Sequence, residues 1–228
     1  MPSFNRVQIL CSLISTFLTF VYAHDCNGQF VDNFSDGNFT TNPTWTGTDT
    51  KFSILSGALK LKAPAVSETA YLSTPGASIN NASWEFLVTI TGGTSSANYA
   101  DVYLVSDAAI LTNSLNGYFV RIGNTADEVA LYQQTGTTKT KIIDGLDGRV
   151  NQTLANIKIK VARDVNGAWQ LFTDATNSGY VPEGSATNAD IFSSVFFGVV
   201  CVYSATRSND YGFDDFVVTG DPYVDPSQ

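Results

Sequence analysis

The sequence contains little histidine and little glutamate, and each shortage excludes a kind of catalysis. Among 228 residues there is one histidine, His24, and it stands outside the expected fold. Ser-His-Asp and Cys-His mechanisms and histidine-ligated zinc sites are therefore excluded. Retaining glycoside hydrolysis needs two carboxyl groups about 5 Å apart. The glutamates are each isolated in the sequence and supply no such pair: Glu68, Glu85, Glu128 and Glu183.

Cysteine is also scarce, and its three occurrences do not make a disulfide framework. Cys11 lies in a predicted leader and Cys26 in the segment just after it. Cys201 lies in an apolar run, which favours a buried free thiol. A bridge between Cys26 and Cys201 in an oxidising compartment stays open.

Positive charge is in short supply. The chain has 12 Lys and Arg against 21 Asp and Glu, which gives a net charge of −9. Binding to nucleic acid or to anionic lipid requires a basic surface. We therefore expect no nucleic-acid partner, and we interpret the acidity as a contribution to solubility outside the cell.

Long hydrophobic runs are absent except at the start. Arg6 provides a short basic region, residues 7–22 form an apolar stretch, and Val21-Tyr22-Ala23 fits a cleavage site. The apolar stretch is short and contains several polar residues, which favours a signal peptide over a membrane span. We predict that residues 1–23 are removed and that the protein is secreted or displayed on the cell surface.

From residue 29 onward the sequence has the period of β-strands. Trp84, Phe86, Val88 and Ile90 alternate with polar residues, as expected of a half-buried strand. Asp164–Gly167 has the composition of a hairpin turn. Residues 106–114 have room for one helical turn. Further strands are predicted at 52–62, 69–73, 99–106, 117–123, 128–134, 138–144, 157–161, 168–173, 194–204 and 211–219.

About a dozen strands in one domain indicate two packed antiparallel sheets. We predict an all-β sandwich over residues 24–220, with Trp45, Trp84 and Trp169 in its core. Residues 221–228 contain two prolines and are interpreted as the start of a linker. The linker would lead to downstream modules of a longer chain.

The two ends of this domain carry acidic, aromatic strands. Phe30–Phe34 begins the domain and Tyr211–Thr219 ends it, so we predict that they lie side by side. Their carboxylates would gather there: Asp32, Asp36, Asp214 and Asp215. Two roles remain open, hydrogen bonding to turn N–H groups and, together with backbone carbonyls, binding of Ca²⁺.

Six segments carry a resemblance to a known family: Asp32–Gly37, Asn42–Trp45, Asn116–Gly123, Lys141–Gly145, Tyr203–Ser208 and Phe213–Phe216. Together they extend along the whole mature chain. The chain resembles the concanavalin A-like lectin/glucanase jelly-roll domains at the N-terminus of large secreted proteins of Bacteroidetes. This resemblance implies a jelly-roll sandwich of two antiparallel sheets and makes a structural calcium ion plausible. The superfamily includes sugar-binding modules as well as glycosidases and lyases, so the fold alone does not define the function.

Three predicted strands, 99–106, 117–123 and 128–134, suggest where a ligand binds. One face of these strands is expected in the core: Val102, Leu104, Tyr118, Val120, Ile122, Val129 and Leu131. The opposite face would present rings and polar groups suited to a glycan: Asp101, Tyr103, Phe119, Arg121, Tyr132 and Gln134. In the alternative interpretation these are ordinary cross-strand pairs in which Arg121 bridges Asp101, and loops cover the sheet.

We expect a secreted, non-catalytic module that binds a polysaccharide or glycoconjugate, or serves adhesion, within a larger surface protein. A divergent glycoside hydrolase or lyase is the second hypothesis, and a structural spacer without ligand is the third. The sequence predicts no cofactor apart from the possible calcium ion.

Overall fold

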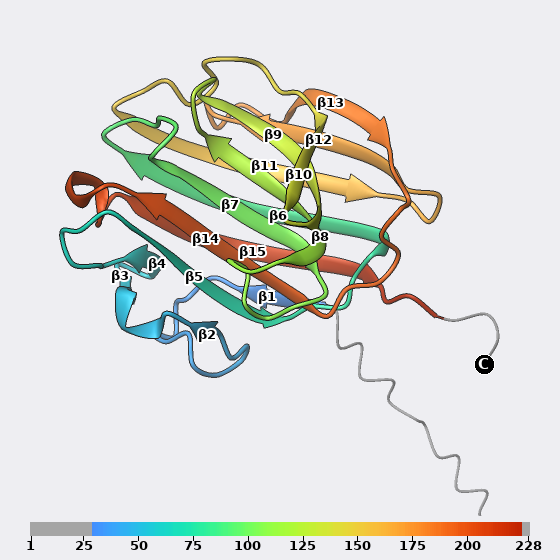
Figure 1. Ribbon diagram of the computed structural model, residues 1–228, viewed down its shortest axis with the longest axis horizontal. Helices are drawn as coiled ribbons and strands as arrows, with labels where there is room; N and C mark the ends of the chain where they lie inside the picture. The colour runs from blue at the N-terminus through green and yellow to red at the C-terminus, as the bar shows by residue number, and fades with distance from the viewer. Residues whose placement is uncertain (1–28, 225–228) are drawn as a thin grey trace, which may run out of the picture.

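The computed structural model describes residues 29–224 and shows a two-layered β-sandwich (Figure 1). Within that range the chain forms 15 strands and two 3-10 helices, η1 (Asp49–Lys51) and η2 (Ala205–Arg207), which confirms the all-β prediction. The predicted signal peptide, residues 1–23, lies outside the described residues, and so does Cys26. Along the part of the chain that is described, no helix is long and apolar enough to cross a membrane.

One layer is an eight-stranded antiparallel sheet, in which β1 (Phe30–Asp32) pairs with β15 (Tyr211–Asp221). Seven strands follow one another across it: β13 (Val181–Thr187), β12 (Ala168–Asp174), β11 (Leu154–Arg163), β6 (Asn80–Thr91), β15, β4 (Ala58–Leu61) and β3 (Phe52–Leu55).

The other layer is a seven-stranded antiparallel sheet. Its strands in spatial order are β10 (Thr138–Ile143), β9 (Glu128–Gly136), β8 (Leu115–Gly123), β7 (Tyr99–Ser106), β14 (Phe196–Tyr203), β5 (Glu68–Pro75) and β2 (Thr46–Gly47).

The structure differs from the prediction in three respects. The predicted strand 52–62 is a hairpin, because Ser56 and Gly57 adopt positive φ angles of 55° and 75° and reverse the chain between β3 and β4. Residues 107–114 form turns and bends and contain no helical turn. The edge strands β2 and β13 were not predicted, because neither shows the alternation of apolar and polar residues that marks half-buried strands.

The two ends of the domain meet, as predicted. Phe30 pairs with Val218 and Asp32 with Phe216, so β1 lies antiparallel to β15. An aromatic cluster between the sheets lies beneath this pairing, in which the ring of Trp45 lies 5.3 Å from that of Phe216 and 5.9 Å from that of Phe197. Large aromatic side chains bury the most apolar surface per residue, so this cluster stabilises the closure of the domain.

The main core lies between the two sheets. All three tryptophans are buried there, as predicted, and the rings of Trp84 and Trp169 are stacked 5.7 Å apart. Cys201 is a buried free thiol in the same core. Both sheets therefore present apolar side chains to the space between them, which is the arrangement expected of packed antiparallel sheets.

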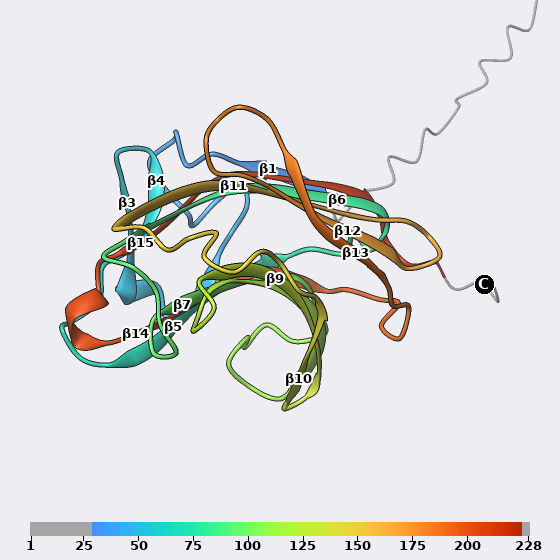
Figure 2. The ribbon, with the colours of Figure 1, turned by 90° about the horizontal axis from the view of Figure 1, so that it is seen from above.

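The seven-stranded sheet is curved, and its outward face is concave (Figure 2). Strand β10 and the turns at 107–114 curl beneath this face (Figure 2). A second, smaller apolar cluster is buried there, formed by Tyr103, Leu111, Leu115, Phe119 and Val200. The concave face is thus partly covered. We call residues 107–114, which lie over it, the roof, and this roof shapes the candidate site.

Candidate functional site

The predicted strands present the two faces that their alternation indicated. The residues expected in the core do pack in the main core: Val102, Leu104, Tyr118, Val120, Ile122, Val129 and Leu131. The six candidate ligand-binding residues lie on β7, β8 and β9 with the opposite alternation: Asp101, Tyr103, Phe119, Arg121, Tyr132 and Gln134. Cross-strand pairing joins Asp101 to Arg121, and Phe119 to both Tyr103 and Tyr132.

These residues do not form an open platform: Arg121 bridges Asp101 and a connecting loop covers this part of the sheet, as in the alternative interpretation of the sequence. Asp101, Tyr103, Phe119 and Gln134 are at most 2% exposed, whereas Arg121 and Tyr132 are partly exposed. The reason is the roof, which places Leu111 against the rings of the smaller cluster. A loop cover of this kind depends on the path of residues 107–114 and has no signature in the alternation of the strands.

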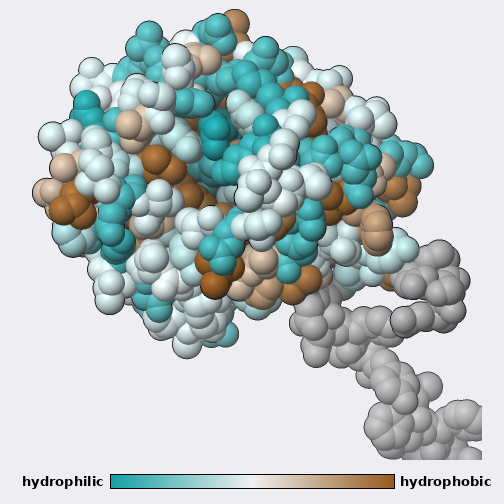
Figure 3. Space-filling view, in the orientation of Figure 1, coloured by the Kyte–Doolittle hydropathy of each residue, from teal (hydrophilic) through white to brown (hydrophobic). Residues whose placement is uncertain are grey.

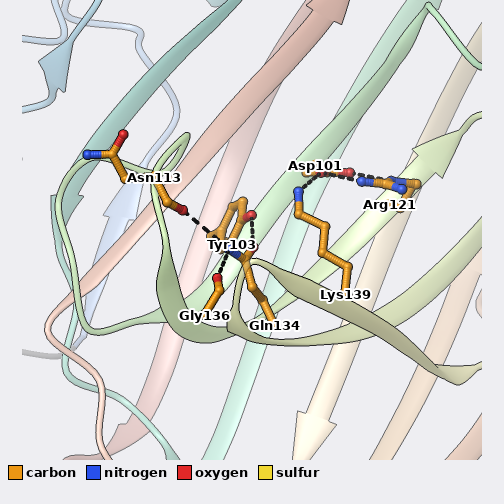
Figure 4. A network of polar contacts seen from close by, with 7 residues as sticks. All are labelled: Asp101, Tyr103, Asn113, Arg121, Gln134, Gly136 and Lys139. Carbon is orange, nitrogen blue, oxygen red and sulfur yellow. Dashed lines mark hydrogen bonds and ion pairs between the residues drawn. The ribbon is translucent and has the colours of Figure 1, made fainter.

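The buried polar groups bond to one another (Figure 4). Arg121 donates Nε–H and Nη2–H to the two carboxylate oxygens of Asp101, both at 2.8 Å. The Tyr103 hydroxyl donates to Oε1 of Gln134 at 2.6 Å. The Gln134 amide in turn donates to the carbonyl of Gly136 at 2.8 Å, so each of these side chains has a partner within the protein.

Electrostatics and stacking hold Arg121 in place. Burial acts to lower the pKa of Arg121, but hydrogen bonding and the charge of Asp101 raise it above its usual range. The guanidinium carbon lies 4.3 Å from the ring centroid of Tyr99 and 5.1 Å from that of Tyr132. The row Tyr99, Arg121, Tyr132 is therefore a stacked, partly exposed strip on the concave face.

A cleft of about 300 Å³ opens beside this strip. Its floor is formed by Val200 and Val202 of β14, and Tyr99 and Lys139 line it together with residues 111–114 of the roof. The space-filling view looks onto this face and shows hydrophilic surface around a hollow near its middle (Figure 3). A ring, hydroxyl groups and a charged group around a concave space form a setting suited to a small polar ligand.

Tyr99 and Lys139 were not predicted as site residues. Tyr99 has the same alternation as Asp101 and Tyr103, so the strand pattern alone contained that signal. Lys139 enters the face through the pairing of β10 with β9, in which Lys139 lies opposite Gln134. The register between β9 and β10 could not be predicted from the sequence.

A charged cluster lies on β9 and β10 beyond Tyr132. The ammonium group of Lys141 donates to Oε1 of Glu128 at 2.6 Å and to Oδ1 of Asp144 at 2.5 Å. Burial raises the pKa of Glu128, and its Oε2 atom is buried with no hydrogen-bond partner in the described structure. Glu128 is isolated in the sequence, but in space it shares Lys141 with Asp144.

The terminal carboxylates bond to the chain itself. Asp32 accepts hydrogen bonds from the backbone N–H of Phe34 at 3.0 Å and from Nε1 of Trp45 at 2.8 Å. Asp36 accepts two from Asn38, at 3.1 and 2.7 Å. Burial raises the pKa of Asp32 above its ordinary value.

The last acidic strand has an irregularity at its acidic pair. The register of β15 against β6 shifts between Asp214 and Val217, and Asp215 has a positive φ of 52°. Asp214 accepts a hydrogen bond from the backbone N–H of Asp215 at 2.8 Å, and burial raises its pKa. This is a β-bulge, which allows Phe213 and Phe216 both to face the core although they are three positions apart.

These four carboxylates do not fit a calcium ion. Calcium takes six to eight oxygen ligands, whereas both oxygens of Asp32 already accept hydrogen bonds from the protein. Among residues 29–224, no group of three or more His, Cys, Asp or Glu is placed to hold a metal. The hydrogen-bonding role is the one that the contacts of Asp32, Asp36 and Asp214 support.

A larger groove, about 850 Å³, lies over the eight-stranded sheet. Alanines and short polar side chains line it together with Lys160, Arg163 and Gln170, and the one ring among its lining residues, Trp169, is fully buried. Sugar recognition depends on exposed rings next to hydrogen-bonding groups. The smaller cleft on the concave face therefore fits such a ligand better.

No protein-family model and no curated protein matches the sequence. Solved structures are similar to its fold. The legume lectin-like domain from Entamoeba histolytica matches with a TM-score of 0.61 and 9% identity, over 84% of this chain and 96% of that chain. The exoplasmic/lumenal domain of VIP36, in a Ca²⁺/Man3GlcNAc-bound form, matches with a TM-score of 0.60 and 11% identity, over 84% of this chain and 90% of that chain. The carbohydrate-binding module CBM66 from Bacillus subtilis matches with a TM-score of 0.53 and 13% identity, over 78% of this chain and 92% of that chain.

These similarities confirm the predicted fold. The chain is a concanavalin A-like jelly-roll β-sandwich. Sequence identities this low show the fold alone, because one fold carries many functions. The function has to be argued from the concave face.

Proposed function

We propose that this protein is a secreted, non-catalytic carbohydrate-binding domain whose ligand lies in the cleft of the concave face. The observation that carries the proposal is the cleft itself, which combines the partly exposed ring of Tyr99 with a polar rim and an apolar floor. Pyranose sugars bind to such sites by packing C–H groups on a ring and hydrogen bonding through their hydroxyls.

The site has two kinds of residue in this proposal. Tyr99, Arg121 and Tyr132 are partly exposed and are available to a ligand. The buried set, Asp101, Tyr103, Phe119 and Gln134, supports them by fixing the stacked strip from below. Groups whose rotamers are held by buried hydrogen bonds lose little entropy on binding, which favours affinity.

Similar structures add support to the sugar-binding hypothesis. One of them holds a mannose-containing glycan and another is a carbohydrate-binding module. Secretion is proposed on the apolar leader of residues 7–22, and similarity to an exoplasmic/lumenal domain agrees with it. The place of this domain within a larger surface protein remains part of the same proposal.

The second hypothesis, a divergent glycoside hydrolase, rests on Glu128 and Asp144. A carboxyl group with a raised pKa next to a second carboxylate is the pairing that glycosidases use as acid and nucleophile. Against it, Lys141 bonds to both carboxylates. We expect no turnover of a polysaccharide panel; hydrolysis that disappears in Glu128→Gln would establish the enzyme instead.

Affinity electrophoresis in gels containing polysaccharides tests the binding proposal. Tyr99→Ala should abolish the retardation of the wild-type protein, because it removes the ring that lines the cleft. Tyr180→Ala is the matched control, since Tyr180 is 38% exposed and lies against Glu85 and Lys160 of the eight-stranded sheet. Equal retardation of both folded variants would exclude this cleft as the site, and no retardation of the wild type by any glycan would favour a spacer.

A further inference from the structure

The cleft on the concave face offers a sugar very few carboxylate acceptors. Asp101 is the one carboxylate among its described lining residues, and it is 1% exposed. Both of its oxygens are engaged at 2.8 Å by Arg121. A carboxylate held in this way has little capacity left to accept hydrogen bonds from sugar hydroxyls, which is how a neutral sugar would be recognised.

Hydrogen-bond donors, in contrast, are available. The ammonium group of Lys139 lies 3.5 Å from Oδ2 of Asp101, a distance at the limit of a hydrogen bond, and its side chain is 35% exposed. It stands 4.9 Å from the ring centroid of Phe119, within the range of a cation–π contact. Figure 4 shows Lys139 reaching from β10 toward Asp101, on the side away from Asn113.

The other polar side chains on the rim are neutral. Thr69, Thr112, Ser114 and Thr137 contribute hydroxyl groups, and Asn113 contributes an amide. With Arg121 and Lys139 against Asp101, two positive charges against one negative, the centre of the face carries one excess positive charge. The chain as a whole carries −9, so this cleft is a local exception to its acidity.

We propose that the cleft is selective for acidic sugars, with Lys139 as the residue that binds the carboxylate or sulfate group of the ligand and the ring of Tyr99 as the surface on which the pyranose packs. This inference rests on the proposed function and names its ligand class. The negative charge of the rest of the molecule opposes a polyanion only at long range. At physiological ionic strength the Debye length is about 8 Å, so contacts within the cleft outweigh that repulsion.

Two forms of one polymer provide the decisive test. Polygalacturonate carries a carboxylate on each sugar, and fully methyl-esterified homogalacturonan has the same backbone without that charge. Calorimetric titration of the wild type should show binding to the acid form at least about tenfold tighter than to the ester, as expected for loss of a charge-assisted contact. A sulfated galactan with its desulfated form makes the second pair, and alginate adds another uronate.

Variants assign the selectivity to Lys139. Lys139→Gln keeps most of the side chain, and we expect it to fold with an unchanged melting temperature and to lose the preference for the acid forms. Lys158→Gln is the control, because it makes the same charge change on the exposed face of the eight-stranded sheet. Selectivity retained by Lys139→Gln would overturn the assignment.

The outcomes separate this inference from the proposed function. Preference for the uronates or for the sulfated galactan supports it and names the anionic group. Binding of the neutral forms as tightly as the acid forms overturns it while leaving the proposed function intact. Absence of binding to every acidic and neutral glycan of the panel contradicts the proposed function itself.

Discussion

At the scale of single residues, the pair formed by Asp101 and Arg121 decides the character of the concave face. Two parallel hydrogen bonds of 2.8 Å join the side chains, which are 1% and 11% exposed. Desolvation offsets much of the attraction in a buried ion pair, so the pair itself is not a large source of stability. Its effect is positional, because it sets the guanidinium between the rings of Tyr99 and Tyr132.

Breaking this pair from one side should be costly. Asp101→Ala leaves the Arg121 charge partly buried without its partner, and we expect the free energy of unfolding to fall by about 3 kcal/mol. Urea denaturation followed by tryptophan fluorescence measures it.

The double variant Asp101→Ala with Arg121→Met distinguishes the penalty of an unpaired buried charge from the loss of the ion pair itself. It removes both charges and should recover about half of the loss, because no uncompensated charge remains. A single variant within about 0.5 kcal/mol of the wild type would show that the pair is solvated rather than buried.

At the scale of elements, the roof over the concave sheet turns an open sheet surface into a cleft, because its residues form one wall of that cleft. Residues 107–114 leave the end of β7 and return to β8, and on the way Leu111 packs on the ring cluster under them. The alternation in the strands predicted which side chains share this face. It left open whether loops would cover them, and the structure shows that the connection between β7 and β8 does so.

Removing the apolar anchor of this roof should loosen it. Leu111 is 2% exposed, so Leu111→Ala is expected to lower the free energy of unfolding by about 2 kcal/mol and to weaken glycan binding, because the roof forms one wall of the cleft. Leu55→Ala is the matched control, since Leu55 on β3 is 43% exposed and should change neither quantity. Unchanged binding in Leu111→Ala would show that the roof does not form part of the ligand site.

At the scale of the whole molecule, the meeting of the chain ends closes the sandwich. β1 pairs with β15, and the cluster around Trp45 and Phe216 lies under that pairing. The carboxylates gathered there serve this architecture. Asp32 accepts a hydrogen bond from the indole N–H of Trp45 and so links the closing strand β1 to the aromatic cluster.

This architecture predicts independence from calcium at the closure. Excess chelator should leave the melting temperature unchanged, because Asp32, Asp36 and Asp214 accept hydrogen bonds from the chain rather than ligating an ion. Differential scanning calorimetry with and without chelator provides the measurement. A fall of several degrees that added Ca²⁺ reverses would show a calcium site built from other ligands.

The sequence by itself determined the class of fold, the pairing of the two ends and the sharing of one face by Asp101, Tyr103, Phe119, Arg121, Tyr132 and Gln134. The fold class and the shared face follow from local information, namely the period of two along a strand and the composition of the turns. The pairing of the ends was inferred from the acidic, aromatic composition that the first and last strands share. Only the tertiary structure decided that four of the six are buried, that Lys139 and Tyr99 line the cleft, and that Glu128 meets Asp144. Each of these depends on the register between strands or the path of a connection, and such long-range contacts leave no periodic trace in the chain.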